Sequence, residues 1–253
     1  MINTKSPHTF HIPVMGLAYT IDSPIRVAHY GISSVISIAD DELIEKMNAF
    51  YSEKFEIPYK EITQKIHDYR AERITSYLNL VDRIVKKKFE DFKTELVESK
   101  QALDNYIAQL PNTSDLKKGF LQLMDEGIAF KENLKHYIEN QLTPGAIDVN
   151  IMTKLDKDNS VGKEQLPVEF NDAHAALRGF ANSNLASSVV LSAGMNPRLY
   201  SYFENFSCFF PDLNNTLKKK ITLKVSDFRS AMIQGNFLAK KGLWVSEYRI
   251  DLD

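Results

Sequence analysis

Residues 11–40 read HIPVMGLAYT IDSPIRVAHY GISSVISIAD, and this stretch decides the fold class. Two short apolar runs rich in Val and Ile flank a segment that begins with Asp22, Ser23 and Pro24 and closes at Gly31. A cap residue followed by Pro in the first turn, with Gly just past the last periodic residue, is typical of a helix. The stretch therefore predicts a strand, a short helix and a second strand, which form a βαβ unit with parallel pairing.

The same alternation of strand and helix returns after residue 146. Apolar runs predict four further strands, over 146–156, 187–194, 219–226 and 243–250. A polar loop follows the first of them, to about Pro167, and helical periodicity covers 169–184, 197–206 and 228–242. We therefore expect an α/β fold of the (β/α)8 TIM-barrel type that ends after about six strands. An open, doubly wound six-stranded sheet is the alternative.

The segment 41–143 between these two parts is all-helical in pattern. Apolar residues recur at steps of three and four, for example at Ile62, Ile66 and Tyr69, and charges fill the gaps. Breaks fall near Pro58, at 111–114 and at 143–145, so three or four helices are expected. The predicted organisation is a first βαβ unit over 1–40, a helical insertion over 41–143, and the remaining strands and helices over 144–253.

Composition excludes several classes of protein. The 253 residues carry 31 Lys and Arg against 33 Asp and Glu, so the basic surplus of a phosphate-binding nucleic-acid protein is absent. Cys208 is the single cysteine, which excludes disulfide scaffolds and cysteine-based zinc sites within one chain. No run approaches the roughly 20 apolar residues of a membrane span, and the N-terminus lacks the apolar core of a signal peptide. A cytoplasmic protein that binds neither nucleic acid nor membrane is expected.

Common catalytic motifs are also missing. The sequence contains no dinucleotide-binding glycine fingerprint, P-loop, zincin H-E-x-x-H or nucleophile elbow G-x-S-x-G. The six histidines show no metal-ligand spacing, and packing is the preferred interpretation for each of them. Neither a metal site nor a serine or cysteine nucleophile is expected.

The strands carry better information, because two of them alternate apolar and polar residues. Parallel strands covered on both sides are usually almost continuously apolar, so a polar face indicates a crevice or barrel mouth where ligands bind. Asn150 and Lys224 are the sharpest candidates, although a strand-end lysine such as Lys154 or Lys224 can also simply reach solvent. After the first strand, Met15 and Gly16 offer either close approach of a flat ligand to the backbone or a tight turn.

These strand ends resemble the nitronate monooxygenase-like, FMN-dependent (β/α)8 barrels. The opening HIPVMGLAYTIDSPIRVAHYGISSVIS, the strand DVNIM, the turn SSVVLSAGMNP and the segment ITLKVSDFRSAMIQGNFLAKKGLWVSE are similar to that family in order and spacing. The resemblance covers 11–40 and 146–250. It implies FMN as the cofactor, with Met15 and Gly16 beside the flavin ring and Asn150 hydrogen-bonded to the pyrimidine edge. It also implies that Lys224 lies near the flavin N1 and O2 atoms and stabilises the negative charge of the reduced ring.

Three departures accompany the resemblance. The family's Gly-Gly-His segment, its phosphate-binding loops after strands seven and eight, and an uninterrupted barrel without the insertion are not found in these residues. The chain is therefore expected to correspond to the N-terminal portion of a longer protein.

The leading functional prediction is an FMN-dependent oxidoreductase that takes a hydride or electrons from a small organic substrate. A second enzyme interpretation makes Lys224 the Schiff-base lysine of an aldolase-like barrel. A non-enzymatic alternative gives the main role to 41–143, as a scaffold or a module for homo-oligomerisation.

Overall fold

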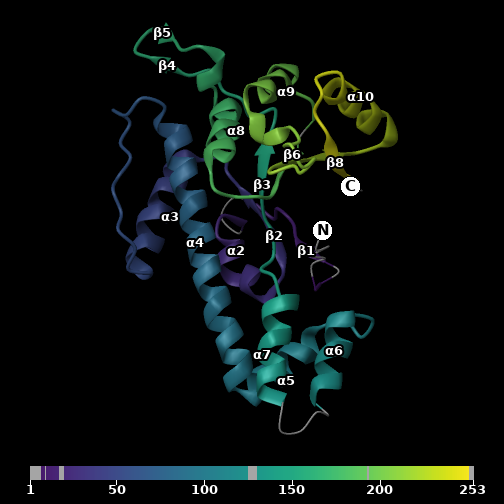
Figure 1. The fold of residues 1–253 in the computed structure, drawn as a ribbon. Helices are drawn as coiled ribbons and strands as arrows, with labels where there is room; N and C mark the ends of the chain where they lie inside the picture. The colour runs from purple at the N-terminus through teal and green to yellow at the C-terminus, as the bar shows by residue number, and fades with distance from the viewer. Residues whose placement is uncertain (1–6, 9, 17–19, 125–129, 193, 251–253) are drawn as a thin grey trace. The chain divides into compact units, whose positions relative to one another are not determined.

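The computed structural model describes residues 7–8, 10–16, 20–124, 130–192 and 194–250 (Figure 1). Within these residues, six strands form one sheet whose spatial order follows the chain, β1-β2-β3-β6-β7-β8. Their bounds are β1 His11–Ile12, β2 Ser33–Ser37, β3 Ile147–Met152, β6 Ser188–Ser192, β7 Lys220–Val225 and β8 Val245–Ile250.

The order of the strands decides between the two predicted topologies. A doubly wound sheet reverses its strand order at a switch point, whereas a barrel adds each new parallel strand to the same edge. The described strands show no reversal, and the pairings of β1 with β2, β3 with β6, β6 with β7 and β7 with β8 are all parallel. The α/β prediction is confirmed, and the sheet is consistent with part of a TIM-type barrel.

The chain divides into two compact units, and two of the divisions fall inside β2 and inside the long helix α4 (Tyr69–Glu98). Unit 1 comprises 1–13, 22–35 and 83–146, and unit 2 comprises 14–21, 36–82 and 147–253.

Unit 1 buries its apolar residues among helices. It contains α2 (Ser23–Val27), the second half of α4, α5 (Lys100–Gln109), α6 (Asp115–Met124) and α7 (Phe130–Gln141). A row of rings runs from the exposed Tyr30 into the core, with edge-on contacts and centroids 5.1, 5.1, 6.1 and 5.1 Å apart; its members are, in order, Tyr30, Phe92, Tyr106, Phe120 and Tyr137. Such contacts add about 1 kcal/mol each beyond the burial of area, so this row is a substantial part of the unit's stability.

The short helix α2 forms largely as the sequence predicts. Pro24 occupies its first turn, and Gly31 ends the following 3₁₀ turn with φ +83°, a conformation that glycine adopts without steric cost. Asp22 precedes the helix, but its carboxylate accepts a hydrogen bond from Arg26 Nη2 and makes no cap to the helix amides.

Unit 2 places helices α3 (Asp41–Lys54), α8 (Asp172–Asn182), α9 (Pro197–Tyr202) and α10 (Phe228–Ala239) with the strands β3, β6, β7 and β8. Helix α8 packs on β3, and α10 packs on β7 and β8. Asp40 caps α3, because its carboxylate accepts hydrogen bonds from the amides of Glu42 and Leu43. Helices α3, α9 and α10 begin just after strands of the sheet, so polar residues at their first turns are held at its carboxyl-terminal edge.

Three details differ from the sequence predictions. Five helices, α3 to α7, lie in the described part of 41–143, where three or four were expected. Ile62 and Ile66 are not helical, because the chain between Pro58 and Tyr69 is a loop and the Ile62 amide donates to Glu45 of α3. The predicted polar loop before Pro167 contains a small hairpin of β4 (Ser160–Val161) and β5 (Glu164–Gln165).

Candidate functional site

The two candidate strand residues lie on one face of the sheet in unit 2. Asn150 on β3 is in register with Val190, Thr222 and then Glu247 on the following three strands. Lys224, two residues after Thr222 on β7, is in register with Arg249 and lies closer to the carboxyl-terminal edge. Because side chains alternate along a strand, one face carries Asp148, Asn150, Thr222, Lys224, Glu247 and Arg249, and we call it the inner face.

An ion pair shows that the inner face is concave. Arg249 Nη2 lies 3.2 Å from Asp148 Oδ2, although β6 and β7 separate their two strands. On a flat sheet three strand spacings, about 14 Å, would lie between β3 and β8. The two side chains meet because this part of the sheet curves toward the inner face, as a barrel wall does.

The same pair spans the inner face, because Asp148 precedes Asn150 on β3 and Arg249 lies nearer the carboxyl-terminal edge on β8. Burial raises the pKa of Asp148, while the Ser188 amide and the Arg249 guanidinium act against that rise. Arg249 also donates to Glu247, and these two carboxylates hold its pKa above the ordinary value although burial alone would lower it. The charges of Asp148, Glu247 and Arg249 are thus paired with one another.

Asn150 is a buried polar residue of the inner face. The residue is 3% exposed, and its position on β3 places its carboxamide on this face. A carboxamide can both donate and accept hydrogen bonds, so it suits a polar ligand. Lys224 lies partly exposed on the same face, and the contact of either residue with a ligand stays a prediction.

Met15 and Gly16 lie in the loop that follows β1, outside the sheet. Met15 is 61% exposed, and Gly16 has φ +125°, in the region that favours glycine. The Gly16 carbonyl accepts hydrogen bonds from the Thr20 amide at 3.1 Å and from the Thr20 hydroxyl at 2.7 Å. This geometry accounts for Gly16 through the turn, while the predicted contact of both residues with a flavin stays a prediction.

A buried cluster that the sequence reasoning missed lies beyond β3 and β6. Asp156 accepts hydrogen bonds from His174, Asn196 and the Ala173 amide, with 3.0 Å between His174 Nδ1 and Asp156 Oδ2. Burial alone would raise the pKa of Asp156, but these donors outweigh it and hold the pKa below the ordinary value. His174 is 1% exposed, so the pair is buried and anchors the loop after β3. Its only signal in the sequence was a carboxylate placed just after a strand.

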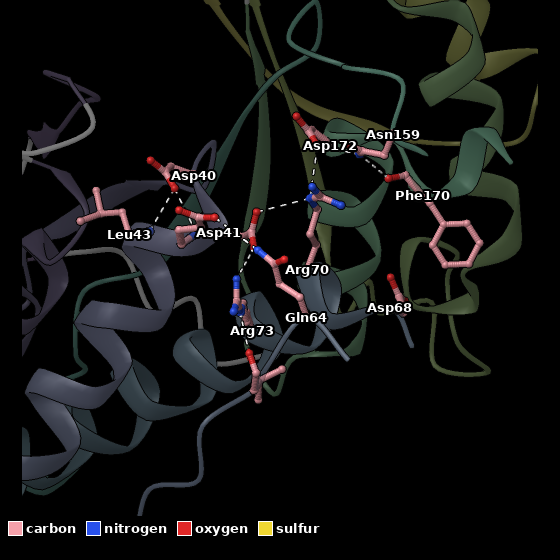
Figure 2. A network of polar contacts seen from close by, with 12 residues as sticks. Asp40, Asp41, Leu43, Gln64, Asp68, Arg70, Arg73, Asn159, Phe170 and Asp172 are labelled. Carbon is pink, nitrogen blue, oxygen red and sulfur yellow. Dashed lines mark hydrogen bonds and ion pairs between the residues drawn. The ribbon is translucent and has the colours of Figure 1, made fainter. Parts of the chain in front are cut away.

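A second polar network lies along the same edge, between α3, α4 and α8 (Figure 2). Arg73 donates to Asp41 at 2.8 Å and to the Ile62 carbonyl, also at 2.8 Å. Arg70 lies between two carboxylates, with its Nε 3.4 Å from Asp41 and 3.5 Å from Asp172. The network fixes the starts of three helices relative to one another within unit 2.

The described residues contain no group of His, Cys, Asp and Glu that is arranged to hold a metal ion. Among the helices in the described ranges, none has the length and apolar character needed to cross a membrane. Comparison of the chain with protein-family models, with curated proteins and with solved structures finds no match.

Proposed function

We propose that this chain forms part of an FMN-dependent oxidoreductase of the barrel type, with the flavin ring against the inner face. The observation that carries the proposal is the position of the Asn150 carboxamide, on a buried residue at the concave side of a parallel sheet. A carboxamide offers one acceptor and two donor hydrogens. It thus complements the alternating carbonyl and N–H groups along the pyrimidine edge of a flavin.

Lys224 supplies the second part of the argument. Thr222 of β7 is in register with Asn150, and Lys224 lies two residues further toward the carboxyl-terminal edge, where barrel enzymes hold their ligands. When bound, FMN supplies hydride and electron transfer. An ammonium group on this face would stabilise the negative charge of the reduced cofactor and so favour reduction.

The experiment is a titration of the full chain with FMN, in which quenching of flavin fluorescence reports binding. Asn150→Leu keeps the size of the side chain and removes its hydrogen bonds, so we expect at least a tenfold weaker affinity. Asn182→Leu, at an exposed carboxamide, is the matched control and should bind FMN like the unaltered chain. Equal FMN affinity in all three proteins would overturn the assignment of Asn150.

Lys224→Met separates this proposal from the aldolase alternative. A flavin enzyme should keep FMN and show a lower reduction potential, because the cation that stabilised the reduced form is gone. Borohydride reduction in the presence of a carbonyl substrate should give no adduct. A lysine adduct at Lys224 would favour the Schiff-base reaction and contradict the flavin role.

A further inference from the structure

A separate cleft lies outside the inner face, between the loop that leads into α4 and the segment around the β4–β5 hairpin. Its volume is about 530 Å³, within the range of small-molecule sites. One wall is formed by 64–70 and the other by Val161, Leu166, Pro167 and Phe170. Apolar side chains make up most of the second wall, so the cleft suits the body of a small hydrophobic molecule.

The two walls are tied together by one arginine of α8. Arg178 donates to both carboxylate oxygens of Asp68 on the first wall and to the carbonyl of Glu169 at the second. Its guanidinium also lies over the Phe170 ring, 5.5 Å from the centroid, and His67 meets that ring edge-on at 5.2 Å. Asp68 has φ +60°, a conformation that a non-glycine residue keeps only where its surroundings hold it. The cleft is therefore a preformed site.

The charges in the cleft favour an anion. Arg178 neutralises Asp68, while the Lys65 ammonium has no ion pair among the described residues. Figure 2 shows Arg70 between Asp41 and Asp172. Arg70 makes no hydrogen bond to a described residue, and its ion pairs with these two carboxylates, at 3.4 and 3.5 Å, are long for charge-assisted bonds. Its guanidinium is stacked at 4.8 Å on the Tyr69 ring, which leaves donor hydrogens for a ligand.

We propose that this cleft binds a small aromatic carboxylate, whose carboxylate accepts a forked pair of hydrogen bonds from Arg70. A planar carboxylate can accept two parallel hydrogen bonds from a guanidinium group, whereas a lysine ammonium acts as a point charge and does not select for a planar ligand. The aromatic body packs between Ile66, Leu166 and Phe170. This site is independent of the flavin proposal, because its residues and those of the inner face are different.

The test uses para-fluorobenzoate as the probe, with fluorine NMR to follow its binding to the full chain. We expect saturable binding and a loss of at least tenfold in affinity for Arg70→Gln, since the charged fork is removed. Arg198→Gln, at an exposed arginine of α9, is the matched control and should leave the affinity unchanged. Because Arg70→Gln also removes a counter-charge from Asp41 and Asp172, Leu166→Glu is a second variant, which repels the carboxylate without altering those pairs.

Four results would overturn the proposal. They are the absence of saturable binding, equal binding by the unaltered chain and Arg70→Gln, binding of neutral para-fluorobenzamide as strong as that of the carboxylate, and tighter binding of phenyl phosphate. Competition by FMN for the probe would show that the cleft belongs to the flavin site, and would contradict its independence. Loss of FMN binding with retained probe binding would refute only the function proposed for the inner face.

Discussion

Replacement of Arg249 by Met tests whether the inner face is concave. The substitution leaves the Asp148 carboxylate, 6% exposed, with the Ser188 amide at 3.0 Å as its remaining hydrogen-bond donor in the structure described. Removing one partner of a buried pair costs about 3–5 kcal/mol. Since the Arg249 side chain is 18% exposed and one donor stays, we expect the lower end, a loss of about 3 kcal/mol in the free energy of unfolding.

The loss should depend on pH in a defined direction. Burial already raises the pKa of Asp148 above its ordinary 3.8, and Arg249 opposes this rise, so its removal raises the pKa further. A carboxyl group whose pKa is higher in the folded state opposes folding once the pH rises through that pKa. The destabilisation should therefore be full above the folded-state pKa of the variant, shrink as the pH falls through it, and be smallest below the folded-state pKa of the unaltered chain.

The assay is urea unfolding followed by far-UV circular dichroism, applied to the unaltered chain, Arg249→Met, Asp148→Asn and the double variant. The double variant should recover most of the loss, with a coupling energy of at least about 1 kcal/mol between the two sites. A coupling energy near zero would refute the reasoning, because two side chains on a flat sheet at this strand separation do not meet.

Three further predictions concern unit 2. Gly179→Ala places a methyl group 2.7 Å from the Ile74 side chain and should lower the free energy of unfolding by about 1–3 kcal/mol; an unchanged urea midpoint would show that α8 and α4 do not pack this closely. Lys219 is fully buried against carbonyls at the end of α8, and burial lowers its pKa from 10.5 to about 8. The free energy of unfolding should therefore rise with pH between these two values, and Lys219→Met should abolish that rise when urea unfolding is measured at a series of pH values. The pKa of Asp156 is held below its ordinary value, so the carboxylate adds to the free energy of unfolding above that ordinary value and loses this contribution as the pH falls. Asp156→Asn should remove this acid sensitivity, and an unaltered pH profile of stability would exclude a contribution from the pair with His174.

The sequence was informative wherever periodicity and local turn chemistry act together. The proline and glycine of 22–31 predicted α2, although the expected Asp22 cap does not form, and the apolar runs predicted all six strands of the sheet. The first strand was predicted too long: β1 is two residues, and Pro13, which has no amide hydrogen for a ladder, follows it at once.

The segment 57–68 shows where periodicity fails. Ile62 and Ile66 have helical spacing, but Glu45 of α3 accepts hydrogen bonds from the Ile62 amide and the Tyr59 hydroxyl, and holds this segment as a loop. A tertiary contact between residues 17 positions apart leaves no trace in local spacing. The same holds for the cleft, because Arg178 and Asp68 are 110 residues apart in the chain.

The inner face was foreseeable only in part. Alternation along DVNIM and ITLKVS placed Asn150 and Lys224 on polar faces, and the structure puts both on one face. Pairing of Asp148 with Arg249 required the curvature of the sheet, which no single strand encodes. Whether Met15, Gly16, Asn150 and Lys224 contact a flavin depends on the cofactor, so those roles stand as predictions.

The most direct test of the central claim follows the side-chain carboxamide of Asn150 by isotope-edited NMR while FMN is added to the full chain. We predict a saturable shift of that carboxamide resonance, assigned by its loss in Asn150→Leu, at the same FMN concentrations at which flavin fluorescence is quenched. A resonance that does not move while FMN binds, or the absence of FMN binding, would contradict the claim that the inner face holds a flavin.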